Sequence, residues 1–156
     1  MAGPGARCYI AAMAHRNLPR QRADEAAVVE RLRSHGIGPT AQRVQIGRVL
    51  FGADQHLTAE EVLAALRVDG KRVSKATVYN TLNLFAAKGL LRTVCAEPGC
   101  SAFDSNTRPH FHFLVEATGE LIDVPPGDVE FARLPSPPPG MESLGVDVVI
   151  RLRRRA

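Results

Sequence analysis

Two histidines separated by one residue, His110 and His112, are the side chains in this sequence best suited to chemistry. In a strand, residues two apart point to the same face, so their imidazoles would lie side by side. Imidazoles combined with carboxylates suit Zn²⁺, Fe²⁺ or Mn²⁺, whereas the alternative is a pair of ordinary surface or core histidines. The candidate metal ligands are His56, Asp104, His110, His112 and Asp123.

A second candidate site is the polar face of a predicted helix that begins after Ser74. Lys75, Tyr79 and Asn83 lie four residues apart with Asn80 beside them, so one face carries hydrogen-bond donors but little bulk. Such a face could enter the major groove of DNA, and the alternative is a solvated helix surface. The candidate DNA contacts are Arg43, Ser74, Lys75, Thr77, Tyr79 and Asn80.

The cysteines give a weaker signal. Cys8, Cys95 and Cys100 form no CxxC pair, which argues against a disulfide framework and a four-cysteine zinc site and favours a reducing, cytoplasmic compartment. Cys95 and Cys100 flank a predicted turn, where they could pair or bind metal, although packing of small residues is the simpler interpretation.

Four helices must position these residues. The helical pattern of the first begins from Asp24, the predicted N-terminal caps of the other three are Thr40, Thr58 and Ser74, and a capping box joins Thr58 to Glu61. The first helix should end by Gly36, the second at Gly52, the third before Asp69-Gly70 and the fourth near Lys88-Gly89. A hairpin of residues 90–94 and 101–103 follows, and helices followed by a hairpin predict a winged helix-turn-helix.

Alternating apolar residues beyond Asp104 predict a second small unit with three strands and one buried face. Its strands should contain Phe111–Val115, Leu121–Val124 and Val146–Leu152. The prolines between residues 125 and 139 leave room only for a short helix around Asp128–Arg133. The predicted fold class is therefore α+β, with a basic arm at 1–23, a winged-helix domain at 24–106 and a small α/β domain at 107–156.

Composition agrees with a globular protein that binds an anionic partner. The chain has 156 residues, 45% of them hydrophobic, and a formal net charge of +4 that includes the arginine run Arg151, Arg153, Arg154 and Arg155. Residues 1–23 combine glycines and prolines with four arginines and no acidic residue, a composition that rarely packs, and they are predicted to be a disordered basic arm. No apolar run approaches the roughly 20 residues of a membrane-spanning helix, and the segment Cys8–Ala14, with its three alanines, barely reaches the minimum length of a signal-peptide core, so we interpret the chain as cytosolic.

The ordered motifs resemble the ferric uptake regulator family over roughly residues 26–154. The motifs are Gly38–Arg43, His56–Glu60, Ala76–Leu82, Gly89–Leu91 and His110–His112. The resemblance implies a DNA-binding winged helix, a C-terminal dimerisation domain with a three-stranded sheet, and a regulatory metal bound between them by the five candidate ligands. It also implies a homodimer acting on a double-stranded DNA operator, with no catalytic residues.

Within that family, four segments look most like the iron response regulators: Tyr79–Leu82, Phe103–Thr107, Glu120–Asp123 and Val146–Arg153. That likeness implies control of iron or haem metabolism genes by iron status, sensed as a divalent metal or as haem. Four features depart from the patterns of the family or of this branch. Asp104 stands where glutamate is usual, Asn80 stands where arginine often follows the tyrosine, and neither a CxxC pair for structural zinc nor a Cys-Pro haem motif is present.

Two other functions stay open on the sequence alone. A regulator of the same family could sense peroxide or another metal through His56, His110 and His112. A small metalloenzyme could use His110 and His112, because histidines with carboxylates can leave a metal with open coordination positions. No nucleophile elbow, glycine-rich phosphate loop or HExxH motif supports the enzyme, so a regulator is the main prediction.

Overall fold

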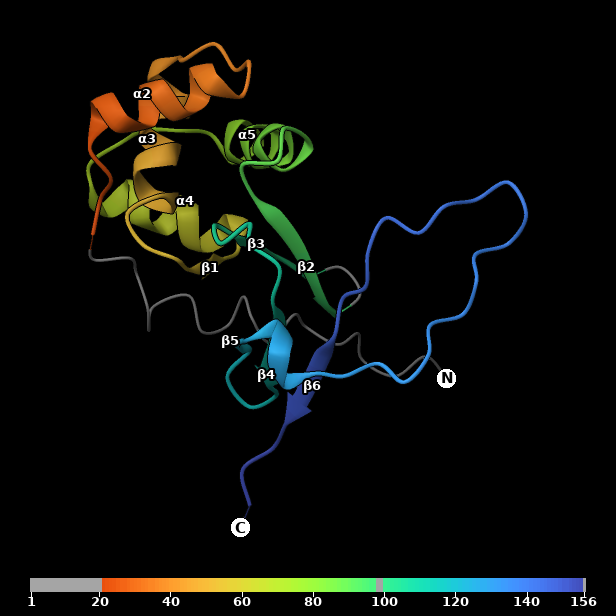
Figure 1. Ribbon diagram of the computed structural model, residues 1–156. Helices are drawn as coiled ribbons and strands as arrows, with labels where there is room; N and C mark the ends of the chain where they lie inside the picture. Colours follow the sequence, from red (N-terminus) through yellow and green to blue (C-terminus); the bar gives the residue numbers. More distant parts are fainter. Residues whose placement is uncertain (1–20, 98–99, 156) are drawn as a thin grey trace, which may run out of the picture. The chain divides into compact units, whose positions relative to one another are not determined.

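The computed structural model describes residues 21–97 and 100–155, and the chain divides into two compact units. The first unit extends to Thr107, and the second begins at Arg108. Helices and a small sheet form the described part of the first unit, while the second contains a sheet and a long loop (Figure 1). The predicted arm at residues 1–23 falls almost wholly outside the described residues.

The four predicted helices are present in the first unit; three begin after their predicted caps, and the structure adds Asp24 as the cap of the first. They are α2 (Glu25–Ser34), α3 (Ala41–Leu50), α4 (Ala59–Val68) and α5 (Lys75–Ala87). The capping side chains accept backbone N–H groups of the first turns, and the reciprocal capping box between Thr58 and Glu61 is formed. Gly89, with φ +75°, ends α5 in a left-handed conformation that glycine adopts without strain.

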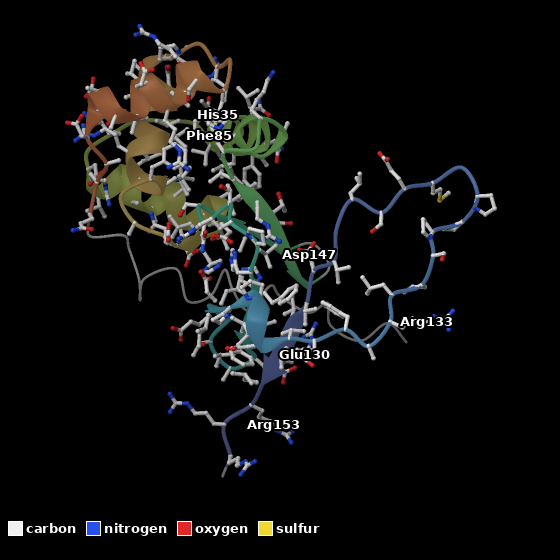
Figure 2. All side chains as sticks on the ribbon, in the orientation of Figure 1. His35, Phe85, Glu130, Arg133, Asp147 and Arg153 are labelled. Carbon is white, nitrogen blue, oxygen red and sulfur yellow. The ribbon has the colours of Figure 1, made fainter. Side chains whose placement is uncertain are left out.

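The apolar stripes of these helices form one core. Phe85 of α5 is fully buried and stacks on Phe51 with ring centroids 5.8 Å apart, and Figure 2 shows Phe85 among the helices of this unit. Fully buried side chains at the centre also include Leu32, Ile46, Leu50, Val62, Leu66, Val78, Leu82 and Leu90. None of the helices among the described residues has the length and apolar character that crossing a membrane requires.

A small sheet extends the first unit. The predicted hairpin is present as β2 (Arg92–Glu97) and β3 (Cys100–Asp104), which pair antiparallel. The structure adds the two-residue strand β1 (His56–Leu57), which the sequence did not predict and which pairs with the other side of β3. The strand order is therefore β1-β3-β2.

The second unit has the predicted three strands, in the order β5-β4-β6. They are β4 (Phe111–Val115), β5 (Glu120–Val124) and β6 (Val149–Leu152). β4 pairs antiparallel with β5 and parallel with β6, so the chain crosses over between β5 and β6 through residues 125–148. Figure 1 shows this connection as a long open loop, and Glu130 and Arg133 mark it in Figure 2.

Three details of the second unit differ from the prediction. The short helix expected at Asp128–Arg133 is absent, and a 3₁₀ turn occupies Pro126–Asp128. Six residues before a restricted Leu134-Pro135 step are too few to offset the cost of helix nucleation. In β4 the buried side chains are His112 and Leu114, whereas the alternating apolar residues at positions 111, 113 and 115 are only half-buried, and β6 begins at Val149 rather than Val146.

Candidate functional site

One imidazole and one carboxylate meet at the sheet edge of the first unit. His56 of β1 pairs in register with Asp104 of β3, and His56 Nε2 lies 3.6 Å from Asp104 Oδ2. The Asp104 side chain is completely buried, and its other oxygen, Oδ1, accepts the backbone N–H of Asn106 at 2.8 Å. A buried carboxylate is costly unless a charge or hydrogen bonds compensate it, so this pair is suited to hold a cation.

The second unit contributes two imidazoles and a carboxylate. His112 lies on β4 opposite Asp123 of β5, and His110 immediately precedes β4. The two rings are in edge contact with centroids 4.6 Å apart, as expected for side chains on one strand face. His110 Nε2 lies 3.5 Å from Asp123 Oδ1. Both histidines are buried, whereas the Asp123 side chain is 36% exposed.

The tautomer of His110 follows from its backbone contact. Nδ1 lies 2.7 Å from the carbonyl oxygen of Arg108, and a carbonyl can only accept, so Nδ1–H donates. In the neutral ring the lone pair then belongs to Nε2, the atom that faces Asp123. Metal-bound histidines typically hold their second nitrogen in such a bond. The five predicted ligands therefore form two groups, one per unit, with donor types that suit Fe²⁺, Mn²⁺ or Zn²⁺.

The predicted DNA contacts lie at and near α5. Ser74, Lys75, Tyr79 and Asn80 are exposed, and Thr77 is half-buried. The hydroxyl oxygens of Ser74 and Thr77 lie 2.8 Å apart, and Ser74 Oγ accepts the Thr77 N–H at 3.0 Å. Both hydroxyls thus serve the helix cap, which leaves Lys75, Tyr79 and Asn80 as the outward-facing part of the predicted set.

Arg43, the remaining predicted DNA contact, makes a hydrogen bond within the protein. Arg43 is half-buried and donates through Nη1 to the carbonyl of Gly38 at 2.8 Å, so part of its guanidinium supports the loop before α3. The side chains of Cys95 and Cys100 lie outside the described residues.

Sequence reasoning missed Glu60, whose carboxylate pairs with Lys75 from the neighbouring helix, because no sequence spacing signals a contact between separate helices.

A sequence profile described as "Ferric uptake regulator family" matches residues 34–133, which is more than half of the chain. The chain belongs to the ferric uptake regulator family. The match includes α3, α4, α5 and both sheets as far as β5, and it therefore covers all five candidate metal ligands.

Curated relatives of this family member include the peroxide-responsive repressor PerR of Staphylococcus aureus, with 38% identity over 92 residues. That alignment covers 59% of this chain and 62% of the relative, so the chain spans about three fifths of the curated relatives that it matches.

Two solved structures carry the comparison of folds. The ferric uptake regulator of Pseudomonas aeruginosa, solved with manganese, is 29% identical with a TM-score of 0.64, covering 83% of this chain and 98% of that one. The Vibrio cholerae regulator has a TM-score of 0.63 at 23% identity, over 81% of this chain and 98% of its own, and shows the shared fold. The named relatives are regulators and repressors, which favours the regulator prediction over the metalloenzyme.

Proposed function

We propose that this chain is a metal-responsive, DNA-binding transcription regulator that acts as a homodimer. The observation that carries the proposal is the set of imidazole and carboxylate donors at His56, Asp104, His110, His112 and Asp123, four of them in buried or half-buried positions of a ferric uptake regulator family member. The solved relative from Pseudomonas aeruginosa contains manganese, which supports a divalent metal as the ligand.

The donor chemistry fits one divalent cation bound by all five residues. Three imidazoles supply nitrogen ligands, and two carboxylates balance the charge of the ion. The Arg108 carbonyl holds His110 with Nε2 available as a ligand, and the Asn106 N–H holds Oδ1 of Asp104. Because these ligands come from both units, a bound ion would favour one arrangement of the units. The ion shifts the populations of the arrangements only if it binds one of them more tightly than the others.

DNA binding is assigned to the first unit. In this proposal α5 is the recognition helix of a winged helix-turn-helix, and the β2–β3 hairpin is its wing. Tyr79 and Asn80 would reach base edges, whereas Lys75 and Arg43 would contact phosphates. Asn80 implies an operator preference different from that of relatives with arginine at this position. The positive net charge of the chain supports an anionic partner.

Dimerisation is assigned to the second unit. Most of the large hydrophobic residues that are exposed among the described residues belong to this unit, and exposed apolar side chains of this kind are typical of an interaction site. They are Ile122, Phe131, Leu134, Met141, Leu144, Val146 and Ile150. Without a four-cysteine zinc site, packing of this surface would hold the dimer.

The signal that we assign to the protein is iron status, as in the iron response regulators that its motifs resemble. The curated relatives are peroxide-responsive repressors, so peroxide is the second candidate signal. Haem is the less favoured form of the iron signal, because no cysteine precedes a proline to supply a Cys-Pro thiolate.

One titration tests the function and its signal together. Apo-protein and, separately, protein loaded with Mn²⁺, Fe²⁺ or Zn²⁺ would first select a DNA duplex from a random-sequence pool. Binding to that duplex would then be measured for apo, metal-loaded and haem-loaded protein, and again after hydrogen peroxide. We expect DNA affinity to depend on a divalent metal. Selection of no sequence under any condition would contradict the proposed function.

A further inference from the structure

An ion pair joins the N-terminal ends of α4 and α5 on the surface of the first unit. Lys75 is the first residue of α5, Glu60 lies in the first turn of α4, and Lys75 Nζ is 2.5 Å from Glu60 Oε1. The two side chains are 64% and 36% exposed, so the pair faces solvent. The hydrogen bond to Glu60 and its negative charge raise the pKa of Lys75, so the pair stabilises the charged form of the lysine.

The position of Lys75 makes this pairing significant. A helix N-terminus carries a partial positive charge, which disfavours a lysine there and favours a nearby carboxylate. Lys75 Nζ also lies 5.7 Å from the ring centroid of Tyr79, one turn along α5. Without Glu60, the lysine and the N-terminus of α5 would together attract any phosphate, whatever the base sequence.

We propose that Glu60 is a specificity-determining residue for DNA binding. Its carboxylate weakens, without abolishing, the attraction of Lys75 for DNA phosphates, and it repels phosphates from the N-terminus of α5. Binding then depends more strongly on base contacts from the rest of the helix, so DNA of the wrong sequence is bound weakly. This inference rests on the proposed function, and it adds a residue that contributes by opposing non-specific attraction rather than by contacting a base.

The test compares Glu60→Gln with Lys75→Gln, with the double variant, and with Glu30→Gln as a matched control. Glu30 is exposed on α2, and its substitution changes the net charge by the same amount. The metal-loaded proteins would be titrated by fluorescence anisotropy at several salt concentrations. The probes are the duplex selected by the wild-type protein and a scrambled duplex of the same composition.

We expect Glu60→Gln to bind the scrambled duplex roughly two- to fivefold more tightly, the range for losing one exposed charge pair. The selected duplex should gain less, so the specificity ratio falls. The dependence of log K on log salt should steepen by up to about 0.9, the value for one added phosphate contact. A structural role alone would move neither the ratio nor this slope. The gain in affinity for the scrambled duplex should be smaller in the double variant and absent from Glu30→Gln.

Three results would overturn the inference: a gain no larger than that of Glu30→Gln, an equal gain on both duplexes, or a gain that persists fully without Lys75. Thermal unfolding of each variant would establish that it is folded. Glu60→Asp, which keeps the charge, should retain most of the discrimination, and Glu60→Ala, which also removes the charge, replaces Glu60→Gln if that variant does not fold. If the wild-type protein selects no duplex, the proposed function fails instead, so the two failures are distinguishable.

Discussion

Replacing Asp104 by asparagine tests the metal site at its most deeply buried ligand. The substitution keeps the size of the side chain, and the amide oxygen can still accept the N–H of Asn106 that Oδ1 accepts at 2.8 Å. The amide nitrogen would take the place of Oδ2, which lies 3.6 Å from His56 Nε2. The fold should therefore survive, while the negative charge that a cation needs is lost.

The expected magnitude follows from linkage between metal binding and folding. Loss or misplacement of a supporting group at a metal site typically costs 10- to 100-fold in affinity, and we take about that range as a minimum for a ligand. At a free metal concentration about 1,000 times the wild-type Kd, the ion stabilises the folded wild-type protein by about 4.1 kcal/mol. A variant weakened 10- to 100-fold would retain about 2.7 to 1.4 kcal/mol of this stabilisation.

Thermal unfolding with and without Mn²⁺ or Zn²⁺ measures this difference. The metal-free variant should be at least as stable as the metal-free wild type, because it no longer buries a carboxylate charge. Asp128→Asn, at an exposed acid of the second unit, is the matched control and should respond to metal as the wild type does. Full metal-dependent stabilisation of Asp104→Asn would refute the assignment of Asp104 as a ligand, and strong destabilisation without metal would identify its role as structural.

Three further predictions concern the other parts of the proposal. Replacing both His110 and His112 by alanine should abolish the response of DNA affinity to metal or haem and leave the dimer intact, and a full response in gel-shift titrations would place the signal elsewhere. Tyr79→Ala should weaken binding to the selected duplex by roughly 1 to 3 kcal/mol without unfolding the protein, whereas unchanged affinity would exclude α5 as the reader. Truncation after Gly145 removes β6 and should yield monomers, and sedimentation of an intact dimer would remove that strand from the interface.

The helices could be predicted because their signals are local. Asp24, Thr40, Thr58 and Ser74 each accept a backbone N–H within three residues, so the information that begins a helix lies next to it in the sequence. The hairpin β2–β3 and the strands of the second unit followed in the same way from alternation and turns. The helix predicted at Asp128–Arg133 is absent and shows the limit of that reasoning. A segment between prolines can be long enough for a short helix and still lack the contacts that would stabilise it.

Contacts between distant segments were beyond this reasoning. The strand β1 has two residues, too few for an alternating pattern, and it forms because β3 offers its free edge. The Glu60–Lys75 pair likewise depends on how α4 packs against α5. The burial of His112 differs from the sequence prediction. The alternating apolar residues, including the neighbouring phenylalanines Phe111 and Phe113, predicted that their own side of β4 would be the buried one. Polar ligands can occupy a buried face when a bound ion or hydrogen bonds compensate the cost of their burial. The alternation of apolar residues in a sequence cannot predict such buried polar side chains.

The segment before His56 explains how the first unit holds its two ligands together. Gln55 donates through Nε2 to the carbonyls of Val49 and Leu50 at 2.7 and 2.9 Å, which satisfies the C-terminal end of α3. Its backbone N–H donates to Ser105 Oγ at 3.0 Å, and its carbonyl accepts the Ser105 N–H at 3.1 Å. His56 therefore follows a residue fixed to α3 on one side and to the end of β3 on the other. Because Asp104 precedes Ser105, the same hydrogen bonds fix both ligands, and this half of the site requires little ordering when an ion binds.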